Sequence, residues 1–224
     1  MKLAIVGYGK MGRMVEQFAP ELGFTIHSKI DAGDPLANAK GADVAIEFSA
    51  PEAAISNLEG LAALGVPTVT GTTGWLGELD RVKATFAKHD GALIWSANFS
   101  IGVNVLLRAV HEVSRLLANE AAYEAWAWEI HHSAKKDAPS GTLLALVREM
   151  QAAGYTRNID QSSNRAGKIA GTHEIGFDSA EDTITLRHTA RTREGFARGA
   201  LRAAQMIQGK KGVHEFKDLL GVTR

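Results

Sequence analysis

Short apolar runs alternate with amphipathic stretches through the first 98 residues of the chain. The apolar runs are typical of buried strands and occupy residues 2–6, 24–30, 43–48, 66–69 and 92–95. The amphipathic stretches predict helices at about residues 10–21, from Pro51 onward, and at 78–88. Strands that alternate with helices are joined by right-handed crossovers, so this part of the chain predicts a doubly wound parallel α/β sheet.

A different pattern follows residue 100. Helices are predicted over residues 102–117, 140–150 and 195–207, and strands over 124–132, 168–177 and 183–189. A short polar turn between the last two strands predicts a hairpin, whereas the polar residues 154–165 predict a loop. We therefore expect a second, α+β domain over residues 101–201, for substrate binding and oligomerisation. Residues 202–224 are expected to pack back on a first domain formed by residues 1–100.

Composition and charge exclude several classes of protein. The 25 Lys and Arg residues balance 25 Asp and Glu residues, so the chain has no overall field to attract nucleic acid or a membrane surface. Cysteine is absent, which excludes disulfides, a Cys nucleophile and Cys-ligated zinc, and fits a reducing compartment. No apolar run approaches the roughly 18 residues of a membrane span, and the first run is too short for a signal peptide. We therefore expect a cytoplasmic protein.

The first strand leads directly into a glycine-rich turn with the pattern G-x-G-x-x-G. The motif consists of Gly7, Tyr8, Gly9, Lys10, Met11 and Gly12. Between a strand and a helix, Gly7 permits the tight turn, Gly9 lets the backbone approach a pyrophosphate, and Gly12 allows close helix–strand packing. The helix N-terminus also offers N–H groups to an anion. The motif predicts a dinucleotide site on a Rossmann-type fold, with a purely structural turn as the alternative.

Asp31 ends the second strand, where a carboxylate can accept hydrogen bonds from the adenine-side ribose. The residues 32–34 that follow include no Arg, which favours NADH over NADPH. Lys10 and Lys29 could still meet a 2′-phosphate, so the expected cofactor is NADH, NADPH or both. An ordinary loop residue is the alternative for Asp31.

Two further loops follow strands at the same edge of the predicted sheet, where ligands bind in doubly wound folds. They add the candidate cofactor-binding residues Gly71, Thr72, Thr73, Ser96, Ala97, Asn98 and Phe99. Small and hydroxylated side chains suit a flat nicotinamide ring, Asn98 could bond its carboxamide, and Phe99 could pack on it. A polar loop without ligand contacts is the alternative for each.

The segment 129–142 concentrates basic side chains around a predicted strand end and helix start. Ser140 or Thr142 can cap the helix, and a helix N-terminus beside His and Lys is an anion site suited to a carboxylate. His131 and His132 point to opposite faces if they lie in a strand, which makes them poor joint zinc ligands. We therefore expect no metal site. A capped helix with a solvated basic loop is the alternative to an anion site.

This segment also resembles the signature of a known enzyme family. The histidine pair, Lys135 and the run Asp-Ala-Pro-Ser-Gly-Thr are similar to the signature of the 4-hydroxy-tetrahydrodipicolinate reductase (dihydrodipicolinate reductase) family. The resemblance covers nearly the whole chain in order and includes the segments 7–12, 71–74, 97–104, 165–167, 171–173 and 195–200. Ser133 and Ala134 stand where the family often has further basic residues, and the chain is shorter than many members.

The resemblance implies an NAD(P)H-dependent reductase of the diaminopimelate route to lysine, which reduces 4-hydroxy-tetrahydrodipicolinate with loss of water. Lys135 would donate a proton, and His131 would act as general acid/base. His132, together with Gly141 and Thr142 at the helix N-terminus, would bind the substrate carboxylates. Hinge closure between the two domains is expected, because one would hold the nucleotide and the other the dicarboxylate. The resemblance also implies a homotetramer assembled through the sheets of the second domain.

Two other functions fit the glycine motif. One is another nicotinamide-dependent oxidoreductase of a small amino or oxo acid, such as an aspartate dehydrogenase, which would not need the Ser-Gly-Thr turn. The other is a non-enzymatic NAD(P)-sensing module, which would have no use for the histidine pair and Lys135. In every case the expected partner is a small molecule, not a nucleic acid or a membrane. Trp126 and Trp128 are expected in the core, with an apolar interface as the alternative.

Overall fold

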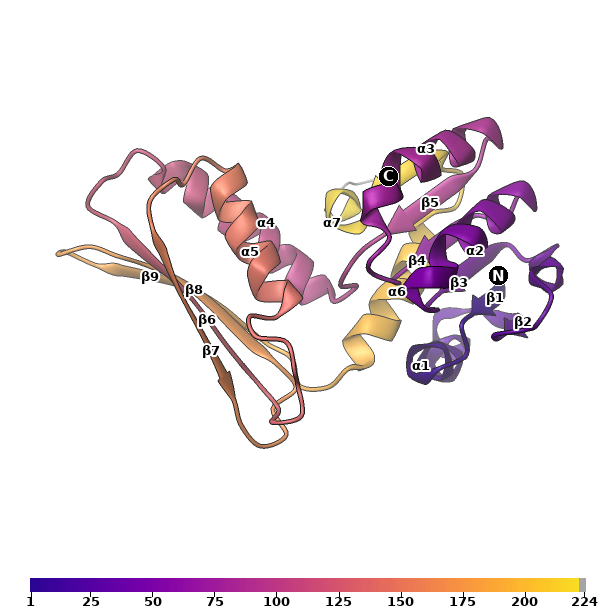
Figure 1. The fold of residues 1–224 in the computed structure, drawn as a ribbon, viewed down its shortest axis with the longest axis horizontal. Coiled ribbons are helices and arrows are strands. Elements are labelled where there is room, and N and C mark those ends of the chain that lie inside the picture. The colour runs from indigo at the N-terminus through magenta and orange to yellow at the C-terminus, as the bar shows by residue number, and fades with distance from the viewer. Residues whose placement is uncertain (222–224) are drawn as a thin grey trace. The chain divides into compact units, whose positions relative to one another are not determined.

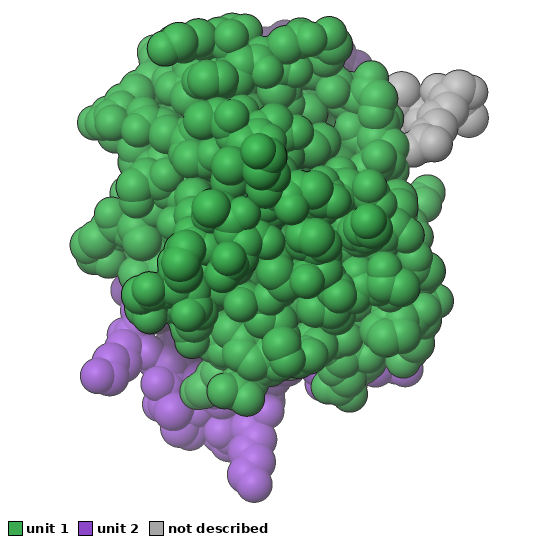
Figure 2. Space-filling view, turned by 90° about the vertical axis from the view of Figure 1, so that its right-hand side faces the viewer, with its two compact units in different colours: residues 1–100, 194–224 green, residues 101–193 purple. Residues whose placement is uncertain are grey.

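The computed structural model describes residues 1–221, which form two compact units (Figures 1 and 2). The first unit contains residues 1–100 and the chain from Glu194 onward. The second unit contains the continuous segment Ile101–Arg193. Each unit has its own sheet with helices packed against it, so each is described separately.

The first unit is built on a sheet of six strands that pair in parallel throughout. The strands are β1 (Lys2–Val6), β2 (Thr25–Ile30), β3 (Val44–Glu47), β4 (Thr68–Thr70), β5 (Ala92–Trp95) and β10 (Gly212–Glu215). Their order is β10-β5-β4-β3-β1-β2, so the direction of winding reverses between β1 and β3. The predicted doubly wound parallel sheet is confirmed. The sixth strand, β10, was not predicted, because its four residues form a short, half-buried run at the edge.

Helices cover both faces of this sheet (Figure 1). They are α1 (Lys10–Phe18), α2 (Pro51–Ala63), α3 (Leu79–Lys88), α6 (Glu194–Met206) and the short α7 (Phe216–Leu219). Successive residues of β1 alternate between the faces: Leu3 and Ile5 pack in the cluster that contains α1 and α6, whereas Ala4 and Val6 pack in another beside α2. Among the described residues, no helix is both long enough and apolar enough to cross a membrane.

The chain returns to the first unit earlier than predicted. Residues 194–201 were expected in the second domain, but the whole of α6 belongs to the first unit. The reason is that one face of α6 consists of apolar, mostly small residues. Ala197, Ala200 and Leu201 are fully buried, and they lie in the core cluster that includes β1 and β3. The correct border therefore lies at Glu194.

The second unit is a four-stranded mixed sheet with two helices on one face (Figure 1). The strands are β6 (Glu124–His131), β7 (Ile159–Arg165), β8 (Thr172–Asp178) and β9 (Thr183–Thr189), in the order β7-β6-β8-β9, and the helices are α4 (Ile101–Leu117) and α5 (Gly141–Ala152). The buried side chains of β6 alternate with half-buried ones on the opposite face. Trp126 and Trp128 lie on that outer face, so their expected place in the core is wrong.

The polar stretch predicted as a loop contains a strand instead. Residues 159–165 form β7, which pairs in parallel with β6, and α5 supplies the crossover between them. Most side chains of β7 are exposed or half-buried, since it is an edge strand. Backbone pairing with β6 therefore overrides a sequence that offers no apolar alternation to identify it.

Candidate active site

The first unit has a cavity of about 410 Å³ at the edge where the carboxyl ends of its strands meet. The cavity is lined by Gly9, Lys10, Met11, Phe48, Ser49, Pro51, Gly71, Thr72 and Thr73. These residues follow β1, β3 and β4. Since the strand order reverses between β1 and β3, the cavity lies at the switch point, where open α/β sheets bind ligands.

The three motif glycines have different surroundings, and each suits the role predicted for it. A Cβ atom on Gly7, which has φ +87°, would lie 2.1 Å from the Phe48 carbonyl oxygen. A Cβ on Gly12 would lie 2.2 Å from the carbonyl oxygen of Gly7, so the start of α1 packs directly on the turn. A Cβ on Gly9 would have no other atom within 4 Å. The backbone at Gly9 is thus open to a ligand at the N-terminus of α1.

A buried glutamate beneath the cavity joins two of its loops. Glu47 is fully buried at the end of β3, and its Oε1 accepts hydrogen bonds from the Ser49 N–H and the Thr72 hydroxyl, both at 3.0 Å. Its Oε2 accepts a hydrogen bond from the Thr70 hydroxyl. Glu47 was not predicted from the sequence, although a charged residue closing an otherwise apolar strand was a usable signal.

Asp31 is exposed just beyond β2, as predicted. Its Oδ1 accepts a hydrogen bond from the Ala32 N–H at 3.0 Å. Lys29, one of the two candidate phosphate ligands, already pairs with Glu16 at 3.2 Å. Lys10 is exposed and lines the cavity.

In the loop after β5, one of the predicted cofactor-binding residues is buried in the core. The Ser96 hydroxyl donates to the Asn98 carbonyl oxygen at 2.8 Å, and Asn98 Oδ1 accepts from the Ser100 N–H at 2.9 Å, so two side chains of the loop bond its own backbone. The Phe99 ring is only 2% exposed and packs against Phe48 and Phe216. It belongs to the core and is not available to pack on a nicotinamide ring, contrary to the prediction.

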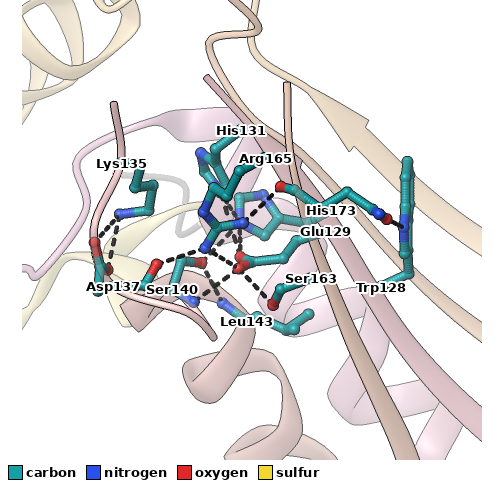
Figure 3. A network of polar contacts seen from close by, with 11 residues as sticks. Trp128, Glu129, His131, Lys135, Asp137, Ser140, Leu143, Ser163, Arg165 and His173 are labelled. Carbon is teal, nitrogen blue, oxygen red and sulfur yellow. Dashed lines mark hydrogen bonds and ion pairs between the residues drawn. The ribbon is translucent and has the colours of Figure 1, made fainter. Parts of the chain in front are cut away.

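In the second unit, the sheet register brings three titratable side chains together. Glu129 and His131 are two residues apart on β6 and therefore share its buried face. His173 on β8 lies directly opposite Glu129. All three side chains are buried, and Figure 3 shows that they converge.

The two oxygens of Glu129 have different surroundings (Figure 3). Oε1 accepts hydrogen bonds from the Ser140 N–H at 2.9 Å, the Ser163 hydroxyl at 2.9 Å and Arg165 Nη2 at 2.8 Å. Burial by itself would raise the pKa of Glu129, but hydrogen bonds from Ser140, Arg165 and Ser163 lower it to about 2. Oε2 has no hydrogen-bond partner and faces the two imidazoles.

The two imidazoles meet at their Nε2 atoms, which are 3.3 Å apart. Burial lowers the pKa of His131 and lowers that of His173 to about 4. The Ser140 hydroxyl lies 3.2 Å from His173 Nε2. Both rings are therefore neutral at pH 7. His131 Nε2, His173 Nε2 and a Glu129 carboxylate oxygen thus converge on one small space.

The loop after β6 carries the cationic part of the site. Lys135 Nζ contacts both carboxylate oxygens of Asp137, at 2.7 and 2.8 Å, and its charge is close enough to lower the pKa of His131. Arg165 Nη2 donates to the Asp137 carbonyl oxygen at 2.5 Å and so joins this loop to Glu129. His132 is half-buried immediately after the strand ends.

The next helix presents its N-terminus beside this loop. Ser140 is the N-cap of α5, and its hydroxyl accepts a hydrogen bond from the Leu143 N–H. A Cβ on Gly141 would meet no other atom within 4 Å, so this turn of the helix faces open space. A helix N-terminus next to cationic side chains can hold a carboxylate.

The structure thus brings together most of the residues predicted for the second site and adds others. His131, Lys135 and the start of α5 are neighbours. No role was predicted from the sequence for Glu129, Ser163, Arg165 or His173. The spacing of Glu129 and His131 on one strand face was a usable signal, whereas Ser163 was hidden in the polar stretch predicted as a loop. The assembled groups can hold an anion, polarise it and move a proton next to it.

Comparisons with known proteins identify the family of this chain. Models of the two parts of dihydrodipicolinate reductase, the N-terminus and the C-terminus, match residues 1–99 and 102–220. The chain is 34% identical to a 4-hydroxy-tetrahydrodipicolinate reductase of Christiangramia forsetii, with 98% of each chain covered. It is 33% identical to the enzyme of that name from Ralstonia nicotianae, with 99% of this chain and 100% of the relative covered.

Solved structures show the same fold. A dipicolinate-bound dihydrodipicolinate reductase from Paenisporosarcina sp. TG-14 has a TM-score of 0.85 at 18% identity, covering 98% of this chain and 99% of its own. An aspartate dehydrogenase from Thermotoga maritima has a TM-score of 0.55 at 11% identity, covering 94% of this chain and 97% of its own. The resemblance found in the sequence is therefore confirmed: the chain belongs to the dihydrodipicolinate reductase family.

Proposed function

We propose that the chain catalyses the reaction of its family in the diaminopimelate route to lysine, the NAD(P)H-dependent reduction of 4-hydroxy-tetrahydrodipicolinate to tetrahydrodipicolinate. In the balanced reaction the substrate loses water and gains one hydride from NAD(P)H and one proton. The products are tetrahydrodipicolinate, water and NAD(P)⁺. Such a reaction needs a nucleotide site and a site for a dianion beside a proton donor. The two units supply one of each kind.

The cavity of the first unit is the proposed nucleotide site. The open backbone at Gly9 and the N-terminus of α1 would hold the pyrophosphate, and Asp31 would accept hydrogen bonds from the adenine-side ribose. Thr72 and Thr73 would border the nicotinamide. The bound nucleotide supplies the hydride. We favour NADH, because the Asp31 carboxylate would repel a 2′-phosphate and Lys29 is already paired with Glu16.

The cluster of the second unit is the proposed substrate site. His132 and the N-terminus of α5, at Gly141 and Thr142, would hold the two carboxylates. Lys135 would donate the proton that the carbon next to the reduced centre requires, and it must leave Asp137 to do so. His131 would act as general acid/base. These groups would also stabilise the negative charge that develops on the substrate after hydride transfer.

The observation that carries this proposal is the convergence of buried His131 with Lys135 and an open helix N-terminus, within a chain of this family. The decisive experiment follows the loss of NADH or NADPH absorbance with enzymatically generated 4-hydroxy-tetrahydrodipicolinate. We expect turnover with this substrate and none with aspartate plus NAD⁺. Turnover of aspartate alone would support a different dehydrogenase, and nucleotide binding without any hydride transfer would support a sensor.

The predicted homotetramer remains part of this proposal. The outer face of the second sheet carries Trp126 and Trp128, which are half-buried and have no helix over them in the described chain. Aromatic side chains on an uncovered sheet face suit an interface between copies. Sedimentation equilibrium of the purified protein tests this, with a species four times the mass of the chain as the expected result.

A further inference from the structure

We propose that Glu129, His131 and His173 form a binding site for Zn²⁺ or a similar tetrahedral transition-metal ion, and that the metal inhibits the enzyme by occupying its proton-transfer residue. The sequence expectation of no metal site considered His131 together with His132, which follow one another on the chain. The sheet register instead pairs His131 with residues on its own face and on β8.

The separations of the three ligand atoms match a tetrahedral metal site. His131 Nε2 lies 3.3 Å from His173 Nε2 and 3.3 Å from Glu129 Oε2, and His173 Nε2 lies 3.4 Å from the same oxygen. Zinc binds imidazole nitrogen and carboxylate oxygen at about 2.0–2.1 Å, and tetrahedral angles then place the ligand atoms about 3.3–3.4 Å apart. All three edges of the observed triangle agree with this value, so one ion can reach all three atoms without rearrangement of the strands.

The carboxylate oxygen in this triangle lacks any other partner. Glu129 is fully buried, yet Oε2 accepts no hydrogen bond, whereas Oε1 accepts three. A buried anionic oxygen without a partner is costly. A cation shared with the two imidazoles would satisfy it. Two histidines and one glutamate with an open fourth position are also a common zinc ligand set.

Glu129 and His131 are held in place by their surroundings. Arg165 and Ser163 fix the carboxylate through Oε1. The His131 ring packs on Gly171. A Cβ atom on Gly171 would lie 2.8 Å from Cε1 of this ring. Preorganisation of this kind favours metal binding, because little side-chain freedom is lost. The fourth position can be taken by water, with the Ser140 hydroxyl 3.2 Å from His173 Nε2 as a neighbour.

Metal binding can be measured without reference to activity. Co²⁺ bound by these ligands should give the intense visible absorption of tetrahedral cobalt, and Zn²⁺ should displace it at one ion per chain. His173→Asn should weaken Co²⁺ binding by more than the roughly 10–100-fold that loss of an outer-shell partner costs. His188→Asn is the matched control, because His188 lies opposite His173 on β9 and is outside the triangle. It should keep the wild-type spectrum and affinity.

Two results would overturn the metal site. One is a His173→Asn protein that binds Co²⁺ as tightly as wild type with the same spectrum. The other is a weak, octahedral cobalt spectrum in the wild-type protein. Circular dichroism of each variant in EDTA establishes that it is folded, and a Zn²⁺-dependent rise in melting temperature, present in wild type and His188→Asn but lost in His173→Asn, gives a second readout.

The inhibitory part rests on the proposed function. Zn²⁺ at buffered free concentrations should lower the reductase rate with the same midpoint as its displacement of Co²⁺, and EDTA should restore the rate. A wild-type enzyme that binds Zn²⁺ but keeps full reductase activity would contradict inhibition. A protein that binds Zn²⁺ but shows no reductase activity even in EDTA would contradict the proposed function and leave the metal site intact.

Discussion

Two buried carboxylates, Glu47 and Glu129, lie at the two proposed sites, and their hydrogen bonds indicate different roles. A buried charge is stable only when hydrogen bonds or opposite charges meet it. Glu47 has both oxygens hydrogen-bonded, to hydroxyl and N–H groups of the loops around the cavity. Glu129 is hydrogen-bonded at one oxygen and directs the other toward His131 and His173. Glu47 therefore shapes a binding surface, whereas Glu129 acts on titratable groups.

Replacing Lys135 tests the proposed proton donor. Lys135→Ala should lower kcat by about 10²–10⁴-fold, the usual range for a lost acid–base group. NADH affinity, measured by fluorescence titration, should be unchanged, because the nucleotide residues belong to the other unit. Lys136→Ala, which removes an exposed neighbouring charge, is the control and should keep nearly wild-type turnover. A Lys135→Ala enzyme with a normal kcat would remove this residue from the mechanism.

Asp31→Ala tests the proposed choice between the two nucleotides. Loss of the carboxylate removes hydrogen bonds to the ribose of NADH and also removes repulsion of a 2′-phosphate. The Kd for NADH should therefore rise more than the Kd for NADPH, each measured by fluorescence titration. Asp80→Ala changes an exposed carboxylate of the same unit and should alter neither. Equal weakening of both nucleotides by Asp31→Ala would place this residue away from the ribose.

At the scale of elements, the turn between β1 and α1 allows a paired test of stability and binding. Gly12→Ala would place a Cβ 2.2 Å from the Gly7 carbonyl oxygen and should destabilise the fold by about 1–3 kcal/mol, as overpacking does. Gly9→Ala meets no atom within 4 Å and should leave stability nearly unchanged. It should nevertheless weaken NADH by about tenfold or more, since the new methyl occupies the proposed pyrophosphate position.

Urea unfolding and NADH titration of both variants separate these effects. The expected pattern is a lower urea midpoint for Gly12→Ala and a raised NADH Kd, with an unchanged midpoint, for Gly9→Ala. If Gly9→Ala bound NADH normally, the open space at this residue would not be the pyrophosphate site.

Elements with a strong apolar signal could be predicted from the sequence, and elements held by pairing could not. β1 and β5 are buried runs and appear where predicted. β7 is a polar edge strand whose place depends on its hydrogen bonds with β6, and β10 is a short edge strand added from the far end of the chain. The same limit applies to the site: His131 and Lys135 could be found by motif, but the meeting of Glu129 with His173 depends on the register of two strands.

The β8–β9 hairpin gives the second unit a pH-dependent stability. Burial lowers the pKa of His188 and lowers that of His173, its neighbour across the two strands, to about 4. Between pH 6.5 and 4 the unfolded chain therefore binds more protons than the folded chain. The stability that these neutral rings contribute is present above pH 6.5 and is lost as the pH falls through their folded pKa values.

Urea midpoints measured in EDTA should therefore decrease from pH 7 to pH 5. His188→Asn should show a smaller decrease than wild type, because one depressed pKa is removed. His89→Asn, which changes an exposed histidine at the end of α3, should behave as wild type. An identical pH profile for His188→Asn and wild type would show that the pKa of His188 is not lowered in the folded protein.

At the scale of the whole molecule, the two units differ in how the chain builds them. The second unit is one continuous segment with its own core. The first unit is discontinuous: its sheet needs β10, and the core cluster on the α1 face needs α6. The proposed nucleotide site therefore depends on the segment 194–215, although the cavity is lined by residues from the first third of the chain.

This topology predicts the result of ending the chain after Arg193. The truncated chain keeps every residue of the cavity, but it exposes the surface that Ala197, Ala200 and Leu201 cover and leaves β5 as an edge strand, paired with β4 alone. Burial of apolar surface is the main favourable contribution to folding, and folded domains are only marginally stable, so loss of a core helix should strongly destabilise the first unit. The truncated protein should fail to bind NADH. The segment 101–193 expressed alone should still unfold cooperatively in urea, because its core is complete. Normal NADH binding by the truncated chain would mean that α6 covers a unit already stable without it, and that its burial is a consequence of the fold rather than one of its causes.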